Sequence, residues 1–256
     1  MIVDCHMHTK ISMDSKLEIE HAIEKSKELD LGLVITEHMD LNFPEAGQFL
    51  FDPEVYFKEY SKYRNNKLFL GMELGMQEIC LEEGRAIVEK YDFDQIIGSI
   101  HIVNGIDIYQ KVYYAGKSKQ EAYSEYLMAM KKNLKLYNFV DTLGHIDYIT
   151  RYAAVADKEI YFEEYRELID EVLKTVISNG QAIELNTRRI SQKAALDNLF
   201  KIYSRYKELG GQLITIGSDA HVVENIGCNF KTARELTEAI GLKAVYYKNR
   251  KPEYMF

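Results

Sequence analysis

The sequence predicts an α/β fold in which parallel strands form a barrel. Short β-branched or aliphatic runs alternate with longer helical patterns, and the 256 residues contain only three prolines and no low-complexity linker. Alternating strands and helices imply a parallel sheet, and seven or eight such units close most naturally into a barrel. We therefore expect one domain that spans residues 1–256.

Seven aliphatic runs are predicted to be strands. They lie at 2–5, 33–36, 68–72, 95–100, 139–143, 182–186 and 213–217, and a further run at 244–247 is expected to be an edge strand or a tail. Ser15 and Glu18 match a capping box before a helix at 16–30, and Asp52 before Pro53 predicts the start of another helix. Glycines expected just after helix ends are Gly32, Gly180 and Gly241.

Composition narrows the possible partners. Acidic residues outnumber basic ones by 40 to 32 and no block of Lys and Arg is present, which argues against nucleic acid as a partner. No apolar run approaches the ~20 residues of a membrane span and no signal peptide is evident, so we expect no membrane partner and a cytoplasmic location. The protein is expected to be a monomer or a small homo-oligomer.

The three cysteines do not suggest a site. Cys5, Cys80 and Cys228 are odd in number and lack paired spacing, so neither a disulfide framework nor a cysteine zinc site is supported. We expect buried free thiols.

Potential metal ligands gather at or just after the ends of the predicted strands. Six of the seven histidines belong to this set, and scattered histidines would show no such preference. A single His-x-His pair is a weak signal, but histidines at successive strand ends indicate a polynuclear metal site at the mouth of the barrel. The set comprises His6, His8, Asp14, His38, Glu73, His101, His145, Asp219 and His221.

The motifs that carry these residues resemble the PHP (polymerase and histidinol phosphatase) superfamily. They are DCHMHT at 4–9, TEH at 36–38, GME at 71–73, GSIH at 98–101, GHID at 144–147 and GSDAH at 217–221. Within the superfamily, LGHIDYITRY at 143–152 and IELNT at 183–187 are similar to the monofunctional histidinol phosphate phosphatases. The resemblance implies a distorted (β/α)7 TIM-like barrel with three divalent metals at its mouth.

The resemblance also implies how the ligands divide. The first metal would be held by His6, His8, Glu73 and Asp219, the second by Glu73, His101 and His145, and the third by Asp14, His38 and His221. Glu73 would bridge the first two. Many superfamily members have histidine where this chain has Asp14, and an aspartate oxygen is an acceptable ligand in its place. Imidazoles and carboxylates without thiolate suit Fe, Mn or Zn.

The charge of such a site suits a phosphate ester. Three divalent ions, three carboxylates and one bridging hydroxide leave a net charge of about +2 for a phosphate monoester dianion. A metal-bridging hydroxide is a nucleophile near neutral pH, because metal binding lowers the pKa of water. The resemblance to the histidinol phosphate phosphatases implies that the reaction is hydrolysis of L-histidinol phosphate to L-histidinol and phosphate, a step of histidine biosynthesis, with Glu73, Asp219 and Arg151 as the catalytic residues.

Several polar residues are predicted to contact the substrate. Arg151 follows His145 by six positions and is expected to clamp the phosphate, since a guanidinium binds two oxygens at once. The alternative interpretation of Arg151 is a solvated cation in a loop. Further expected substrate contacts are Arg188, Arg189, Ser99 and Asp40. Tyr109 is a candidate for the pocket wall, whereas His21, in the first helix, is expected on the surface.

Two other functions remain open from the sequence. A PHP phosphoesterase that acts on nucleotides or other small esters would use the same metal ligands. A noncatalytic PHP module is the alternative from a different class, although such domains usually lose ligands and this chain retains every expected position. Amidohydrolase chemistry is less favoured, because its metals are usually bridged by a modified lysine and Glu73 takes that place here.

Overall fold

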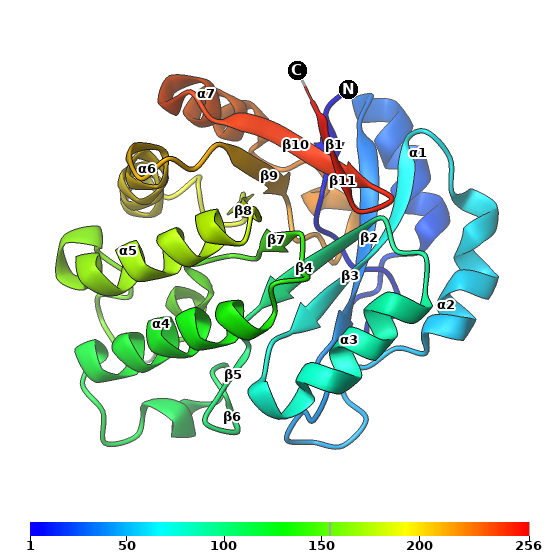
Figure 1. Cartoon of the computed structure of the whole chain (residues 1–256). Helices are drawn as coiled ribbons and strands as arrows, with labels where there is room; N and C mark the ends of the chain where they lie inside the picture. Colours follow the sequence, from blue (N-terminus) through cyan, green and yellow to red (C-terminus); the bar gives the residue numbers. More distant parts are fainter. Residues whose placement is uncertain (154, 256) are drawn as a thin grey trace.

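The computed structural model describes residues 1–153 and 155–255 and contains a nine-stranded main sheet. Figure 1 shows the sheet surrounded by helices. The first seven strands of this sheet are parallel and neighbour one another in chain order. They are β1 (Val3–Asp4), β2 (Gly32–Met39), β3 (Leu68–Gly75), β4 (Gln95–Ser99), β7 (Thr142–Leu143), β8 (Ala182–Asn186) and β9 (Leu213–Gly217).

Backbone contacts bring the first strand beside the last of these seven. The amide of Cys5 donates to the carbonyl of Ile216 at 2.9 Å, and the amide of Asp219 donates to the carbonyl of His6 at 2.8 Å. An isolated parallel bridge joins Met7 to Ala220. The seven strands therefore curve into the distorted (β/α)7 barrel that the sequence predicts.

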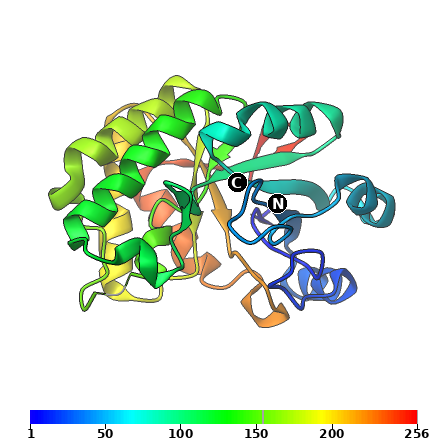
Figure 2. The same ribbon diagram turned by 90° about the horizontal axis from the view of Figure 1, so that it is seen from below.

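A helix follows each barrel strand, and from below these helices surround the strands (Figure 2). The helices are α1 (Ile19–Leu29), α2 (Pro53–Tyr60), α3 (Leu81–Lys90), α4 (Lys119–Leu136), α5 (Phe162–Ser178), α6 (Lys193–Glu208) and α7 (Phe230–Ile240). Short 3-10 turns lie at η1 (Ser61–Tyr63), η2 (Glu78–Cys80), η3 (Lys111–Tyr114), η4 (Tyr148–Arg151) and η5 (Val223–Asn225). Within the described residues, no helix combines the length and the apolar character needed to cross a membrane.

Two strand pairs extend the barrel. The predicted strand at 244–247 is β10 (Lys243–Lys248), which runs parallel to β9 and pairs antiparallel with β11 (Lys251–Tyr254). Both chain termini lie near this pair in Figure 1. A hairpin of β5 (Ile102–Val103) and β6 (Ile106–Asp107) lies toward the opposite end. The sequence prediction included neither β11 nor this hairpin.

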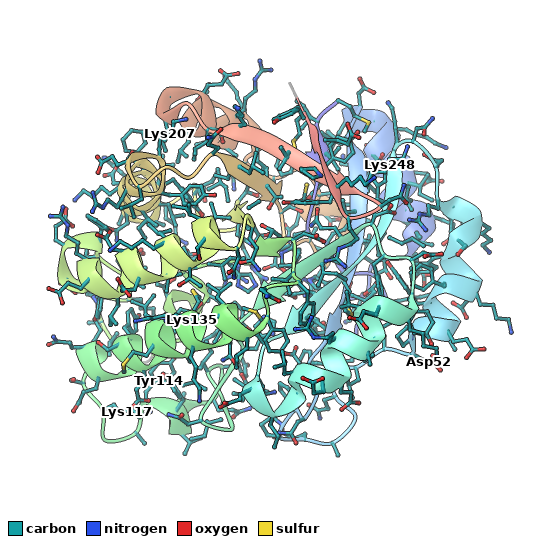
Figure 3. All side chains as sticks on the ribbon, viewed as in Figure 1. Asp52, Tyr114, Lys117, Lys135, Lys207 and Lys248 are labelled. Carbon is teal, nitrogen blue, oxygen red and sulfur yellow. The ribbon has the colours of Figure 1, made fainter. Side chains whose placement is uncertain are left out.

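The predicted helix caps are partly correct. The Asp52 side chain accepts hydrogen bonds from two amides at the start of α2, where Figure 3 labels it. The capping box at Ser15 and Glu18 is wrong, because α1 has no side-chain cap and the Ser15 hydroxyl donates to the carbonyls of His8 and His221. Gly241 adopts the left-handed conformation at the end of α7, as expected. Gly32 instead begins β2.

The core fills the barrel and the layer beneath the helices. Every residue of β2 and β3 is buried, as expected for parallel strands that are covered on both faces. Many tyrosines pack in this core with their hydroxyls satisfied, as when Tyr56 donates to the carbonyl of Ile35. Cys5 and Cys80 are buried free thiols, but Cys228 is exposed, contrary to expectation, because it lies in the loop before α7.

Candidate metal centre

The nine candidate ligands lie at one end of the barrel, where the parallel strands end. Glu73 is at their centre and is fully buried. Its Oε1 atom lies 3.3 Å from Nε2 of His101 and 2.9 Å from Nε2 of His145. Its Oε2 atom lies 3.4 Å from Nε2 of His6 and 3.5 Å from Nε2 of His8. The two oxygens of one carboxylate thus face different histidines, and Oε2 also lies 2.9 Å from Nδ1 of His38.

The remaining ligands complete two further groups. Asp219 directs Oδ1 toward Nε2 of His8 at 3.4 Å. Its φ of +55° is in the left-handed region, which aspartate tolerates better than most residues. Asp14 directs Oδ2 toward Nε2 of His221 at 3.1 Å and Nε2 of His38 at 3.5 Å. The structure thus brings all nine residues together.

The donor atoms suit metal ions. Three ligand atoms of His6, His8 and Glu73 lie within 4.8 Å of one another, as do those of Glu73, His101 and His145, and those of His8, His38 and His221. Both ring nitrogens of His38 and Oε2 of Glu73 are buried and have no hydrogen bond among the residues that the structure describes, although Nδ1 of His38 is 2.9 Å from that oxygen. Buried polar atoms of this kind are rare unless an ion or water satisfies them. The nitrogen and oxygen donors fit a divalent transition metal.

Opposing charges in the cluster displace the pKa values of its members. Burial alone would lower the pKa of His6 and of His101, but carboxylates beside them raise both well above the usual range. Burial would raise the pKa of Glu73, but the neighbouring histidines lower it strongly. Burial and the charges of His38 and His221 lower the pKa of His8. Because metals bind the deprotonated ligands, metal binding at this cluster would release protons.

A buried carboxylate anchors the loop that carries Asp14. Glu37, next to His38, accepts hydrogen bonds from the amides and the hydroxyls of both Thr9 and Ser12. The Ser12 hydroxyl also accepts from the amide of His38 at 3.0 Å. These bonds tie the 9–15 loop to the end of β2 and keep Asp14 beside its two histidines.

Asp40 and Ser99, two of the predicted substrate contacts, lie within hydrogen-bond distance of metal-ligand candidates. Asp40 lies 2.9 Å from Nδ1 of His101, so this ring presents Nε2 to Glu73. Ser99 donates its hydroxyl to Oε1 of Glu73 at 2.7 Å and is fully buried. Asp40 also lines the cavity described below, whereas Ser99 does not. Both residues are therefore placed to orient ligands.

Arg151 lies beside the cluster, at the end of η4. Its side chain is 7% exposed, and Nη1 donates to Oδ2 of Asp219 at 2.6 Å. Burial alone would lower the pKa of Arg151, but the charge of Asp219 raises it. Nε has no hydrogen-bond partner within the described residues. The guanidinium is thus held as a cation at the edge of the cluster with donor capacity to spare.

The two neighbouring arginines after β8 point to different places. Arg188 lines the cavity, with Nη1 3.8 Å from Asp219 and a side chain that is 45% exposed. Arg189 is buried away from the cavity lining, where its guanidinium bonds Asp147, Thr150 and Glu159. It therefore joins the segment after β7 to the segment before α5, and its donors are already engaged.

A cavity of about 520 Å³ opens above the cluster. Seven of the nine candidate ligands line it, all except His6 and His8, and so do Arg151 and Arg188. The size is typical of small-molecule sites. Its outer wall combines aromatic rings with acids and amides: Phe43, Phe49, Tyr109, Tyr148, Tyr152, Glu45, Asp107, Gln48 and Gln110.

The sequence prediction missed most of this wall. Tyr109 was expected there, but the residues at 43–49 and Asp107 come from loops and a short hairpin whose paths no periodic pattern reveals. No role was predicted from the sequence for Glu184, which is part of the IELNT motif. In the structure its carboxylate contacts both His6 and the backbone of His145.

Comparisons with known proteins agree with this geometry. Residues 4–188 match the family model of the PHP domain. The chain is 48% identical over 254 residues to a protein of Clostridium acetobutylicum named probable histidinol-phosphatase, covering 99% of this chain and 100% of that one. It is 31% identical over 246 residues to the histidinol-phosphatase of Lactococcus lactis, covering 93% of this chain and 91% of that one.

A solved structure is similar over nearly the whole chain. It is the crystal structure of the histidinol phosphate phosphatase of Lactococcus lactis in complex with zinc, L-histidinol and phosphate. The TM-score is 0.93 at 28% identity, and the match covers 98% of each chain. The chain described here therefore belongs to the PHP family and, within it, to the histidinol-phosphatases.

Proposed function

We propose that this protein is a metal-dependent phosphomonoesterase that hydrolyses L-histidinol phosphate to L-histidinol and phosphate. One observation carries the proposal: nine metal-ligand candidates gather at one end of the barrel, and seven of them line a cavity together with Arg151. The similar structure of the Lactococcus lactis enzyme, which contains zinc, L-histidinol and phosphate, supports the same substrate here.

We propose three divalent metals, Fe, Mn or Zn, in this centre. Glu73 would share its carboxylate between the first metal, with His6, His8 and Asp219, and the second, with His101 and His145. The distances support that division, because Oε2 lies near His6 and His8 whereas Oε1 lies near His101 and His145. Asp14, His38 and His221 would hold the third. When bound, such ions supply Lewis acidity and an activated water for attack on phosphorus.

Arg151 would bind the phosphoryl group. Its Nη1 is occupied by Asp219, but the rest of the guanidinium faces the cavity side of the cluster and can donate to phosphate oxygens. A preorganised cation stabilises negative charge that develops on those oxygens in the transition state. Arg188, which is more exposed, would add a second and weaker contact. Arg189 would support the site by holding neighbouring segments together.

The outer wall suits the histidinol half of the substrate. Histidinol carries an ammonium group and an imidazole ring. Glu45 and Asp107 provide carboxylates that attract the ammonium, and Phe43, Phe49 and Tyr152 provide rings against which an imidazole packs. Asp40, which was expected to contact the substrate, would orient His101.

The test is a comparison of substrates. We would measure kcat/KM for L-histidinol phosphate beside nucleoside monophosphates, sugar phosphates and glycerol phosphate, with protein loaded with Mn, Fe or Zn. We expect a preference of at least about 100-fold for histidinol phosphate, because a ligand that leaves the acids and rings unpaired loses about 3 kcal/mol or more. Faster turnover of nucleotides would favour the alternative phosphoesterase. No turnover with any ester in fully metallated protein would favour a noncatalytic module.

A further inference from the structure

Glu184 links two halves of the candidate metal centre. It lies in β8 and is fully buried. Its Oε1 atom is 2.6 Å from Nδ1 of His6, and its Oε2 atom accepts a hydrogen bond from the amide of His145 at 2.7 Å. The Glu184 carboxylate therefore contacts the ring of His6, a candidate ligand of the first metal. It also contacts the backbone of His145, a candidate ligand of the second metal.

The first contact determines which nitrogen of His6 is available. A carboxylate that accepts from Nδ1 keeps the proton on that nitrogen, so the lone pair is on Nε2. Nε2 is the atom that faces the cluster, 3.1 Å from Nε2 of His8 and 3.4 Å from Oε2 of Glu73. Glu184 thereby prepares His6 to bind a metal through Nε2, as carboxylates commonly do beside metal-bound histidines.

Glu184 is placed to act as an acceptor and not as a ligand. Its carboxylate is close enough to His6 and His145 for the three to be considered a metal-binding group. However, Oε2 is used by a backbone amide, which cannot be displaced without loss of a buried hydrogen bond. Oε1 faces Nδ1 of His6, on the side of the ring away from the cluster. Glu184 also does not line the cavity, so it has no path to the substrate.

The two contacts require a carboxylate at this position. The ring N–H of His6 and the amide of His145 are both donors, and both need an acceptor because they are buried. A carboxylate offers two acceptor oxygens, whereas the amide of glutamine offers only one. Replacement by glutamine therefore leaves one donor facing an NH2 group, and the bond to His6 or the bond to His145 is lost.

Gly217 provides the space for this arrangement. It ends β9 between β8 and the segment that follows β1. A Cβ atom at this position would lie 2.4 Å from Cβ of His6 and 2.5 Å from Oε1 of Glu184. Any side chain at 217 would therefore push the carboxylate and the imidazole apart while leaving the chemistry of both groups intact.

We propose that Glu184, which packs against Gly217, is a positioning residue. It sets the tautomer of His6 and the backbone position of His145, and so fixes the relative positions of candidate ligands of two metals. This inference rests on the proposed ligand set. It predicts that loss of Glu184 weakens metal binding and slows the chemical step, while substrate binding through the outer wall of the cavity changes little.

The experiment compares Glu184→Gln and Gly217→Ala with the wild-type protein. After loading with Zn and dialysis against a graded chelator, metal content is counted by mass spectrometry, and kcat and KM are measured on the same samples. We expect metal retention and kcat to fall about 10–100-fold in both variants, with KM changed less than about threefold. Excess Zn in the assay should restore part of kcat.

Matched controls separate this role from general damage. Asp141→Asn alters another buried carboxylate, at the amino-terminal end of β7, and Gly84→Ala adds a methyl group whose nearest neighbour is 3.4 Å away. Both should retain metal. Thermal unfolding of the metal-free proteins reports whether each variant folds. If Glu184→Gln does not fold, Glu184→Asp, which keeps a carboxylate but withdraws it from His6 and His145, decides the question.

A further variant, His6→Ala, distinguishes failure of the inference about Glu184 from failure of the proposed ligand set. His6→Ala must lose metal if the proposed ligands are correct. If His6→Ala loses metal but folded Glu184→Gln and Gly217→Ala retain it with wild-type kcat, the inference about Glu184 is overturned and the ligand set stands. If His6→Ala also retains all metal, the ligand set itself is wrong.

Discussion

Nη1 of Arg151 lies 2.6 Å from Oδ2 of Asp219, while Oδ1 of the same carboxylate faces Nε2 of His8 at 3.4 Å. Asp219 is therefore shared between an arginine and the candidate metal cluster. This arrangement places a fixed positive charge next to the metals without making Arg151 one of their ligands. Its role should thus be separable from metal binding.

Replacement of Arg151 should impair catalysis but not metal content. We expect Arg151→Met to lower kcat/KM for L-histidinol phosphate about 100- to 1,000-fold, the usual cost of removing one preorganised donor from a transition state. Arg151→Lys should recover only part of this, because an ammonium cannot hold Asp219 and phosphate in the same fork. Loss of metal together with activity in Arg151→Met would show that the arginine acts through Asp219.

The adjacent arginines should respond in opposite ways. Arg189→Met leaves the buried carboxylates of Asp147 and Glu159 without their partner, so we expect the free energy of unfolding to fall by about 3–5 kcal/mol. Arg188→Met should change stability by less than about 0.5 kcal/mol, because its side chain is largely exposed, but should raise KM. Urea unfolding and steady-state kinetics on both variants test this pair. If Arg189→Met is as stable as the wild-type protein but has a raised KM, Arg189 contacts the substrate.

Asp14 should be required for one metal only. It contacts His38 and His221 but neither His101 nor His145. We expect Asp14→Ala to bind about one metal fewer than the wild-type protein and to retain the two that share Glu73. Metal counting after chelator challenge gives the difference, with His21→Ala, an exposed histidine in α1, as the control. An unchanged metal count in Asp14→Ala would remove Asp14 from the ligand set.

Stability should depend on pH through Asp141. Burial raises the pKa of this carboxyl from 3.8 to about 6, although Arg250 opposes the shift. The folded state therefore holds this proton more tightly than the unfolded chain, and the contribution of Asp141 to stability falls as pH rises between these values. From pH 5 to pH 8 the loss is about 1 kcal/mol.

The matched variant for this effect is Asp141→Asn, which cannot titrate. Urea unfolding of both metal-free proteins at pH 5 and pH 8 gives four free energies. At each pH, the free energy of unfolding of the variant is subtracted from that of the wild-type protein. This difference should be lower at pH 8 than at pH 5 by about 1 kcal/mol. A difference that stays constant between the two pH values would contradict the assigned pKa.

The barrel was predictable because each strand is a short buried run that stands alone between helical patterns. The metal cluster was predictable for a related reason: its residues follow strand ends, and the strand ends of a parallel barrel meet at one rim. β11 was missed because its residues, Lys251–Tyr254, are exposed and include a proline, so no apolar alternation marks them. The hairpin at 102–107 was missed although Asn104-Gly105 is a hairpin turn signal, because each of its strands has only two residues.

Roles of individual side chains were harder to predict than their locations. Arg188 and Arg189 are adjacent in sequence, but only the structure shows that Asp147 and Glu159 engage the second of them. Asp40 lines the cavity and Ser99 does not, and each is hydrogen-bonded to a ligand candidate. Such pairings depend on side chains from distant segments, and no local pattern encodes them.

The most direct test of the proposed function is whether turnover requires bound metal and the carboxylate of Glu73. Metal-free protein and its Glu73→Gln variant would be titrated with Mn, Fe or Zn while phosphate release from L-histidinol phosphate and bound metal are measured on the same samples. The proposal predicts no turnover without metal, turnover that rises as the wild-type sites fill, and loss of both metal and turnover in the variant. Undiminished turnover in the presence of a strong chelator, or full activity in Glu73→Gln, would contradict it.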